Sequence, residues 1–277
     1  MKTHRTVADI RRALEPHRHR ATIALVPTMG ALHAGHVALF EAARRASDVV
    51  VASVFVNPSQ FGDQADFAAY PRNEAHDERL AAGAGVDFCF APSVDELYPS
   101  GYATWVQVDG PAQALEGAHR PGHFRGVATV CAKLFHIVSP RLAFFGQKDA
   151  QQVAVVARLV RDLNLDIEIR VVPVVRDLDG LALSSRNVRL SGEERARALA
   201  IPRALDAGLA AYRDGRDPVA AARAVLSGLA GVDIDYLVLA DFLGQPTLAV
   251  AARVGATRLI DNVPLHFEGA LVEGISR

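Results

Sequence analysis

The chain has 277 residues, half of them hydrophobic, and 30 basic residues against 31 acidic ones. This length allows one large domain or two modest ones, and the balanced charge indicates no basic surface for a nucleic acid. The longest apolar run, "VVVASVFV", is far shorter than the roughly 20 residues that a membrane-spanning helix needs. The basic N-terminus lacks the apolar stretch of a signal peptide.

The two cysteines, Cys89 and Cys131, each lie inside an apolar run. They match no metal-ligand spacing and no disulfide framework, which fits a reducing cytoplasm, where we place the protein. We expect both to be small core residues, although either could also be a reactive thiol.

The first 175 residues alternate predicted strands and helices. The predicted strands are 22–28, 48–56, 86–92, 141–146 and 167–174, and the predicted helices are 34–46, 73–85, 123–140 and 149–164. This alternation is typical of βαβ units and predicts a doubly wound parallel α/β sheet. A polar segment rich in Gly and Pro, 108–123, interrupts the alternation, and such long loops are often functional.

The pattern changes after Val175. A turn-rich connector, "RDLDGLALSSRN" (176–187), precedes two helical segments, 192–215 and 217–230. Three strand-like runs follow, at 232–241, 247–254 and 257–263. Helices followed by short strands predict a small α+β domain, so we divide the chain into domains 1–175 and 176–277.

Two histidines lie where the first strong strand turns into a helix, in "LVPTMGALHAGHVALF" (25–40). Ligands of open α/β sheets bind at the carboxyl ends of strands, where helix N-termini attract phosphate. His33 and His36, on either side of Gly35, could donate hydrogen bonds to phosphate oxygens there. The alternative is that one histidine caps the helix and the other only packs.

Other phosphate-binding motifs are missing from the sequence. It has no G-x-x-x-x-G-K-[ST], and no G-x-G-x-x-G follows the first strand. The run "GAG" at 83–85 is expected to close a helix rather than to open one. The sequence therefore predicts neither a P-loop nor a dinucleotide fingerprint.

A strand followed by H-x-G-H and a helix resembles the signature of the nucleotidylyltransferase superfamily, which class I aminoacyl-tRNA synthetases share. Four further stretches follow in order: "FVNPSQFG" (55–62), "RPGHFRGV" (120–127), "FFGQKDAQQ" (144–152) and "DGLALSSRN" (179–187). With "PTMGALHAGH" they resemble the family of pantothenate synthetases, or pantoate–β-alanine ligases, over residues 22–190. The last part of the chain matches in length and general character only.

The resemblance implies a Rossmann-like first domain and a ligase that joins (R)-pantoate to β-alanine while ATP is cleaved to AMP and pyrophosphate. The pantoate carboxylate would attack the α-phosphorus of ATP, and the β-alanine amine would then attack the pantoyl adenylate. We expect Mg²⁺ to bind through the ATP phosphates, the smaller domain to act as a lid, and the chain to form a homodimer. Its other partners would be the three small substrates, with no nucleic acid and no membrane.

The resemblance also implies which residues form the site. His33, His36, Lys148 and Arg186 would be catalytic, with His36 in the proton-donor role. Gln60 and Gln152 would bind pantoate, and Gln60 also β-alanine. ATP would contact the four catalytic residues and, in addition, Met29, Gly30, Ala31, Leu32, Ala34, Gly35, Gly146, Gln147, Asp149, Val175, Leu183, Ser184 and Ser185.

Residue chemistry supports several of these roles. Lys148 is one of only three lysines beside 27 arginines, and its ammonium is a compact charge suited to phosphate. Ser184, Ser185 and Arg186 offer two hydroxyls and a guanidinium to a pyrophosphate leaving group. A neutral amide at Gln60 could both donate to and accept from a hydroxy acid. Arg120, in the long polar loop, could assist at the phosphates.

Two other functions remain open from the sequence. Another H-x-G-H enzyme would adenylylate a phosphorylated cofactor precursor, but it would not explain both the Gln60 loop and "LSSRN". A nucleotide sensor on the same fold would be expected to lack His36 or Lys148. Pyrophosphate release from ATP with pantoate, with phosphopantetheine or with neither would separate the three.

Overall fold

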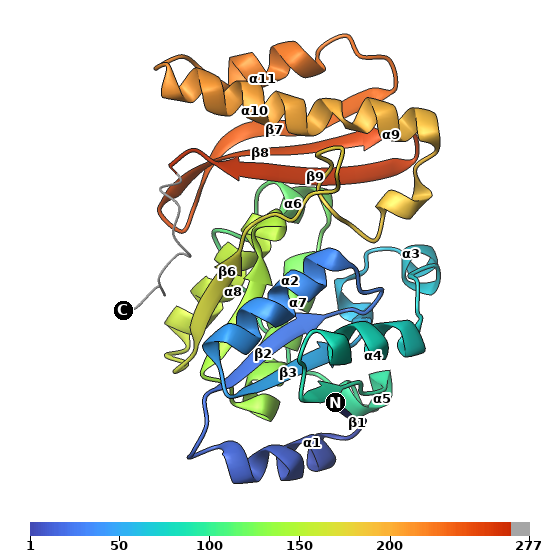
Figure 1. Cartoon of the computed structure of the whole chain (residues 1–277), viewed down its shortest axis with the longest axis vertical. Helices are drawn as coiled ribbons and strands as arrows, with labels where there is room; N and C mark the ends of the chain where they lie inside the picture. The colour runs from blue at the N-terminus through green and yellow to red at the C-terminus, as the bar shows by residue number, and fades with distance from the viewer. Residues whose placement is uncertain (267–277) are drawn as a thin grey trace. The chain divides into compact units, whose positions relative to one another are not determined.

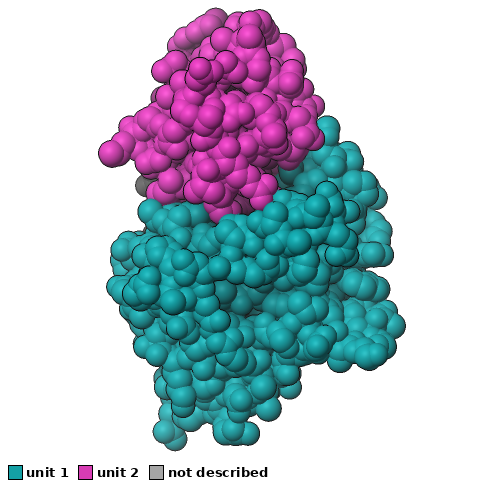
Figure 2. Space-filling view, turned by 90° about the vertical axis from the view of Figure 1, so that its right-hand side faces the viewer, with its two compact units in different colours: residues 1–146, 151–172, 271–277 teal, residues 147–150, 173–270 magenta. Residues whose placement is uncertain are grey.

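The computed structural model describes residues 1–266, which form two compact units. Figure 2 colours the first unit, residues 1–146 and 151–172, teal, and the second, residues 147–150 and 173 onward, magenta. The grouping of 147–150 with the second unit was not foreseen from the sequence. Within residues 1–266, no helix has the length and apolar character needed to cross a membrane.

The first unit is built on a parallel sheet of six strands in the order β1-β4-β3-β2-β5-β6 (Figure 1). Its strands are β1 (Lys2–His4), β2 (Ile23–Thr28), β3 (Val49–Val54), β4 (Phe88–Phe90), β5 (Leu142–Gly146) and β6 (Glu168–Val172). Its helices are α1 (Val7–Leu14), α2 (Ala34–Ala46), α3 (Gln64–Ala68), α4 (Glu74–Gly83), α5 (Val94–Leu97), α6 (Glu116–His119), α7 (His123–Val138) and α8 (Ala150–Asp162), with 3₁₀ turns η1 (Glu15–His17) and η2 (Pro58–Gln60).

Helices cover both faces of this sheet. Successive strand residues point to opposite faces, and the buried side chains accordingly separate into two clusters. Leu25 of β2 belongs to a cluster with α1, α7 and α8. Its neighbours Ala24 and Val26 belong to a second cluster with α2 and α4. The predicted doubly wound α/β fold is confirmed.

The strand order reverses beside β2. From β2 the chain continues to β3 and β4 on one side, and then returns to add β5 and β6 on the other. In such sheets the carboxyl ends of the two strands at the reversal are the usual place for a ligand. β2 ends at Thr28, immediately before the Gly-rich turn, and β5 ends at Gly146.

The second unit is an α+β fold, as predicted. Its antiparallel sheet has the order β7-β8-β9, with β7 (Val232–Phe242), β8 (Gln245–Val254) and β9 (Thr257–Pro264). Its helices are α9 (Gly192–Ala198), α10 (Ala200–Arg213) and α11 (Pro218–Leu226), with 3₁₀ turns η3 (Gln147–Asp149) and η4 (Asn187–Arg189). Leu205, Leu226 and Leu248 are fully buried in its core.

Most predicted elements are present. β1 and α1 were not predicted, because the N-terminal segment is basic and short in apolar residues. The predicted helix 192–215 is two helices, α9 and α10, which meet at Leu199. The run 83–85 does close a helix, since α4 ends at Gly83.

Candidate active site

His33 is the N-cap of α2. Its Nδ1 accepts a hydrogen bond from the backbone N–H of Gly35 at 3.1 Å, and its own backbone N–H donates to Nδ1 of His36 at 3.3 Å. The two rings lie 4.2 Å apart, centroid to centroid. The structural role that the sequence offered as an alternative, a helix cap, is therefore present.

This cap also determines which ring nitrogen carries the proton. A neutral imidazole has one N–H and one acceptor nitrogen. Because backbone N–H groups donate to both Nδ1 atoms, the proton of each neutral ring is on Nε2. Capping and donation to a ligand are thus compatible, since in both histidines Nδ1 accepts the backbone hydrogen bond and Nε2 can donate to a ligand.

A buried carboxylate shapes the turn before these histidines. Asp77 of α4 accepts hydrogen bonds from the backbone N–H groups of Ala31, at 2.9 Å, and Leu32, at 2.8 Å. The turn is strained, because Ala31 has a φ of +51° and Gly30 one of +78°. A Cβ at Gly30 would lie 2.8 Å from Oδ2 of Asp77, so glycine is required there both for the backbone angle and for space.

Gln60 lies buried at the end of η2, where Asn57 holds its amide. Nδ2 of Asn57 donates to Oε1 of Gln60 at 3.0 Å, and Nε2 of Gln60 donates to Sδ of Met29 at 2.9 Å. The second hydrogen on Nε2 and the second lone pair on Oε1 match the donor–acceptor role expected of this amide.

Asn57 was not singled out from the sequence, although it lies in the quoted motif "FVNPSQFG". Its side chain is almost fully buried, and Oδ1 accepts hydrogen bonds from Ser59 Oγ at 2.8 Å and Tyr98 Oη at 3.0 Å. Burial raises the pKa of Tyr98 to about 12, so its hydroxyl remains a donor. The sequence feature that could have identified Asn57 is its place directly before Pro58, at the start of a loop after a central strand.

The loop motif "RPGHFRGV" reaches the main chain of Gln60. Nδ1 of buried His123 lies 2.9 Å from the Gln60 carbonyl oxygen, and Nη1 of Arg120 lies 3.2 Å from Nε2 of His123. Gly126 permits close packing of α7, because a Cβ there would lie 2.4 Å from the carbonyl oxygen of Ser59. Arg120 thus contacts groups around Gln60.

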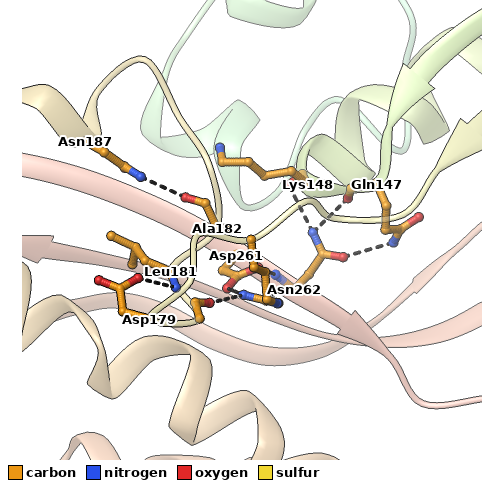
Figure 3. Close-up of polar contacts among 10 residues, drawn as sticks. Gln147, Lys148, Asp179, Leu181, Ala182, Asn187, Asp261 and Asn262 are labelled. Carbon is orange, nitrogen blue, oxygen red and sulfur yellow. Dashed lines mark hydrogen bonds and ion pairs between the residues drawn. The ribbon is translucent and has the colours of Figure 1, made fainter. Parts of the chain in front are cut away.

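The segment with Lys148 is bound to β9 within the second unit (Figure 3). Asn262 donates from Nδ2 to the carbonyl oxygens of Gln147, at 2.9 Å, and Lys148, at 3.0 Å. Its Oδ1 accepts from Nε2 of Gln147 at 2.9 Å. Lys148 is half-buried and Asp149 is exposed.

The connector with "LSSR" folds back on itself in the same unit. The backbone N–H of Leu183 donates to the carbonyl of Val175 at 2.9 Å, and Arg176 forms a β-bridge with Ala182. Oγ of Ser184 accepts from the backbone N–H of Arg186 at 3.2 Å. The half-buried residues of this turn are Leu183, Ser184, Ser185 and Arg186.

The predicted site residues are divided between the two units. The first unit contains Met29, Gly30, Ala31, Leu32, His33, Ala34, Gly35, His36, Gln60, Gly146 and Gln152. The second contains Gln147, Lys148, Asp149, Val175, Leu183, Ser184, Ser185 and Arg186. Gln152 lies half-buried in α8, beside the buried Gln151, whose Nε2 donates to the carbonyl of Ala114 at 2.7 Å.

Residues 1–266 contain no group of three or more His, Cys, Asp or Glu side chains placed to hold a metal ion. Both cysteines are buried and unpaired with one another, as expected for core residues. Burial raises the pKa of Cys89 to about 12, and that of Cys131 to about 12. A reactive thiol at either position is therefore disfavoured.

Comparison with known proteins agrees with these motifs. The family model described as pantoate-beta-alanine ligase matches residues 2–264. Pantothenate synthetase of Moorella thermoacetica is 50% identical over 96% of this chain and 99% of its own, and that of Acidobacterium capsulatum is 51% identical over 96% and 97%.

Solved structures show the same likeness. Pantothenate synthetase from Thermus thermophilus is 48% identical, with a TM-score of 0.90 over 96% of this chain and all of that one. A pantoate-beta-alanine ligase from Francisella tularensis, complexed with beta-gamma ATP and beta-alanine, is 32% identical, with a TM-score of 0.83 over 96% and 98% of the two chains. The chain belongs to the family of pantoate–β-alanine ligases.

Proposed function

We propose that the chain performs its family's reaction, joining (R)-pantoate to β-alanine with cleavage of ATP to AMP and pyrophosphate. In the first step a pantoate carboxylate oxygen attacks the α-phosphorus, and pyrophosphate leaves. In the second step the β-alanine amine attacks the carbonyl carbon of pantoyl adenylate, and AMP leaves with the bond electrons. The observation that carries this proposal is the pair His33 and His36 at the start of α2, whose Nδ1 atoms both accept backbone hydrogen bonds, in a chain of this family.

Residues of the first unit bind pantoate and part of ATP in this proposal. His33 and His36 donate to phosphate oxygens as negative charge grows on them during adenylation. Their backbone turn, with Met29–Leu32, contacts the nucleotide. Gln60 and Gln152 hold pantoate, and Gln60 also orients β-alanine. Arg120, which contacts His123 beside Gln60, assists at the phosphates.

Residues of the second unit bind the rest of ATP. Lys148 places a localised positive charge on the phosphates, while Ser184, Ser185 and Arg186 stabilise the departing pyrophosphate. Backbone contacts to the nucleotide come from Gln147, Asp149, Val175 and Leu183, and from Gly146 at the end of β5. ATP would thus draw the second unit over the nucleotide as a lid, which limits hydrolysis of the acyl adenylate by water.

Mg²⁺ would accompany ATP, held mainly by the phosphates. Magnesium commonly keeps several waters and binds through substrate phosphates rather than through a protein cage. The ion would neutralise charge on the phosphates.

Pyrophosphate release tests this function. The purified protein is incubated with ATP and Mg²⁺ plus pantoate, phosphopantetheine or no acceptor, and β-alanine is then added. We expect release only with pantoate, and pantothenate and AMP in equal amounts after the addition. Release with phosphopantetheine would favour the other H-x-G-H enzyme, and ATP binding without any release would favour a sensor.

We also propose that the protein is cytoplasmic and forms a homodimer. The two cysteines, unpaired with each other, fit a reducing compartment, and the dimer is implied by the resemblance. Light scattering would check the latter, since the monomer has a mass of 29.6 kDa and a dimer would have twice that value.

A further inference from the structure

One side chain of β9 contacts the segment around Lys148 through three hydrogen bonds, two of them to main-chain carbonyl oxygens. Asn262 is 4% exposed, and both of its polar atoms are used. Nδ2 donates to the carbonyl oxygens of Gln147 and Lys148, and Oδ1 accepts from the side-chain Nε2 of Gln147, as Figure 3 shows. A single side chain therefore restrains the backbone of Lys148 and the residue before it.

The preceding residue, Asp261, binds the connector that leads to Ser184–Arg186. Its buried carboxylate accepts from Nη1 of Arg176 at 2.6 Å and from Nη2 at 3.2 Å. Nη1 of Arg176 also donates to the carbonyl of Gly180 at 3.1 Å. Two adjacent residues of one strand thus hold both segments of the second unit that carry proposed phosphate ligands.

We propose that Asn262 is a positioning residue for the adenylation step. It acts through Lys148, because it fixes the main chain from which the ammonium group reaches the phosphates. The neighbouring Asp261 restrains the connector that leads to Ser184–Arg186. This inference rests on the proposed function, because it assigns Asn262 no contact with substrate. The chemistry requires an amide, since a carboxylate of the same shape has no hydrogen to donate to two carbonyl oxygens.

Two variants separate hydrogen bonding from shape. Asn262→Ala removes all three contacts, and Asn262→Asp keeps the shape but faces two carbonyl oxygens with a carboxylate. Misplacing a catalytic group by about 1 Å can cost about 10²-fold in rate. We expect single-turnover formation of pantoyl adenylate to fall about tenfold or more in Asn262→Ala and further in Asn262→Asp, with little change in KM for pantoate.

Leu259→Ala is the matched control for a general loss of stability. Leu259 is buried on the same strand and packs in the core of the second unit, without a place in the proposed site. We expect a lower melting temperature and an adenylation rate close to that of the wild type. Wild-type adenylation by folded Asn262→Asp would overturn the inference.

A double-mutant cycle tests whether Asn262 acts through the lysine. In a Lys148→Ala background, Asn262→Ala should slow adenylation no further, because there is no ammonium left to position. The inference would be overturned if the rate losses of Asn262→Ala and Lys148→Ala multiplied in the double variant, or if Lys148→Ala alone had the wild-type rate. If the proposed function fails, the wild type itself releases no pantoate-dependent pyrophosphate. If only this inference fails, the wild type is active and the rate losses of the two single variants multiply in the double variant.

Discussion

The carboxylate of Asp77 accepts a hydrogen bond of 2.8 Å from the backbone N–H of Leu32, 45 residues earlier in the chain. Its other oxygen accepts from Ala31. Two backbone N–H groups of the turn are thus satisfied by one buried carboxyl group. Asp77 therefore shapes the approach to His33 before any ligand binds.

Replacing Asp77 should weaken adenylation without removing any group that we propose to touch ATP. Asp77→Asn leaves one oxygen acceptor for two backbone donors and turns an N–H₂ group toward the other. Hydrogen bonds to charged groups contribute about 1.5–3 kcal/mol, so we expect a lower melting temperature and about a tenfold slower adenylation. Glu74→Gln, in the exposed first turn of the same helix, serves as the control and should change neither.

The Asp77 contact illustrates what the sequence could not predict. The local pattern was sufficient to place α2 at its observed bounds, because apolar spacing and the turn before it lie within a few residues. The pairing of Asp77 with residues 31–32, and of Asn262 with 147–148, joins segments far apart in the chain. Neither residue type nor spacing indicates such a partner.

The sequence indicated the candidate substrate-binding residues better than the residues that hold them in position. His33, Gln60 and Lys148 were proposed from motifs. Asn57 and Asn262 were not, because the sequence alone does not show whether an asparagine is buried or exposed. The N-terminal strand β1 was missed for a similar reason. Its three residues, Lys2–His4, have no apolar pattern and are placed by pairing with β4.

Removing the second histidine should slow adenylation strongly. His36→Ala removes a donor from charge that grows on the phosphates, and loss of one such donor typically costs about 10²–10³-fold in rate. Pyrophosphate release with pantoate measures the effect, and circular dichroism checks the fold because His36 also accepts from His33. His136→Ala, an exposed histidine on α7, should retain wild-type activity. Near-normal release by folded His36→Ala would contradict the role of His36.

Arginine should not replace the lysine of the 147–149 segment. A guanidinium is planar and bulkier, and its charge centre lies elsewhere than that of an ammonium. We expect Lys148→Arg to slow single-turnover adenylation well beyond tenfold, whereas Lys2→Arg, at the exposed N-terminus, should have no effect. Equal rates for Lys148→Arg and the wild type would show that a compact charge is not required.

Both thiols should be inert in the folded enzyme. Reaction with Ellman's reagent requires the thiolate, and burial raises the pKa of Cys89 and Cys131 to about 12. A raised thiol pKa favours the neutral form, so at a mildly alkaline pH of about 8, below the ordinary thiol pKa, we expect no reaction of the native protein. Both thiols should react after unfolding in guanidinium chloride. Rapid labelling of either thiol in the native protein, without loss of structure, would contradict the prediction that this cysteine is an inert core residue.

ATP should protect the connector of the second unit from hydrogen exchange. The contacts proposed for Ser184, Ser185 and Arg186 exist only when the phosphates are bound, so ATP shifts the protein toward the state that makes them. Gly180, which has a φ of +92° and where an added Cβ would meet no atom within 4 Å, is the expected hinge. Slower exchange at 179–190 with ATP, measured by mass spectrometry, checks the lid.

Arg186→Ala should weaken this protection and raise hydrolysis of pantoyl adenylate, measured as AMP formed without pantothenate. Arg203→Ala, an exposed arginine on α10, should do neither. Water reaches an acyl adenylate more readily when the site stays open, so the two effects should appear together in one variant. Unchanged exchange at 179–190 with and without ATP would remove the support for a lid, even if Arg186→Ala still slowed adenylation through lost contact with pyrophosphate.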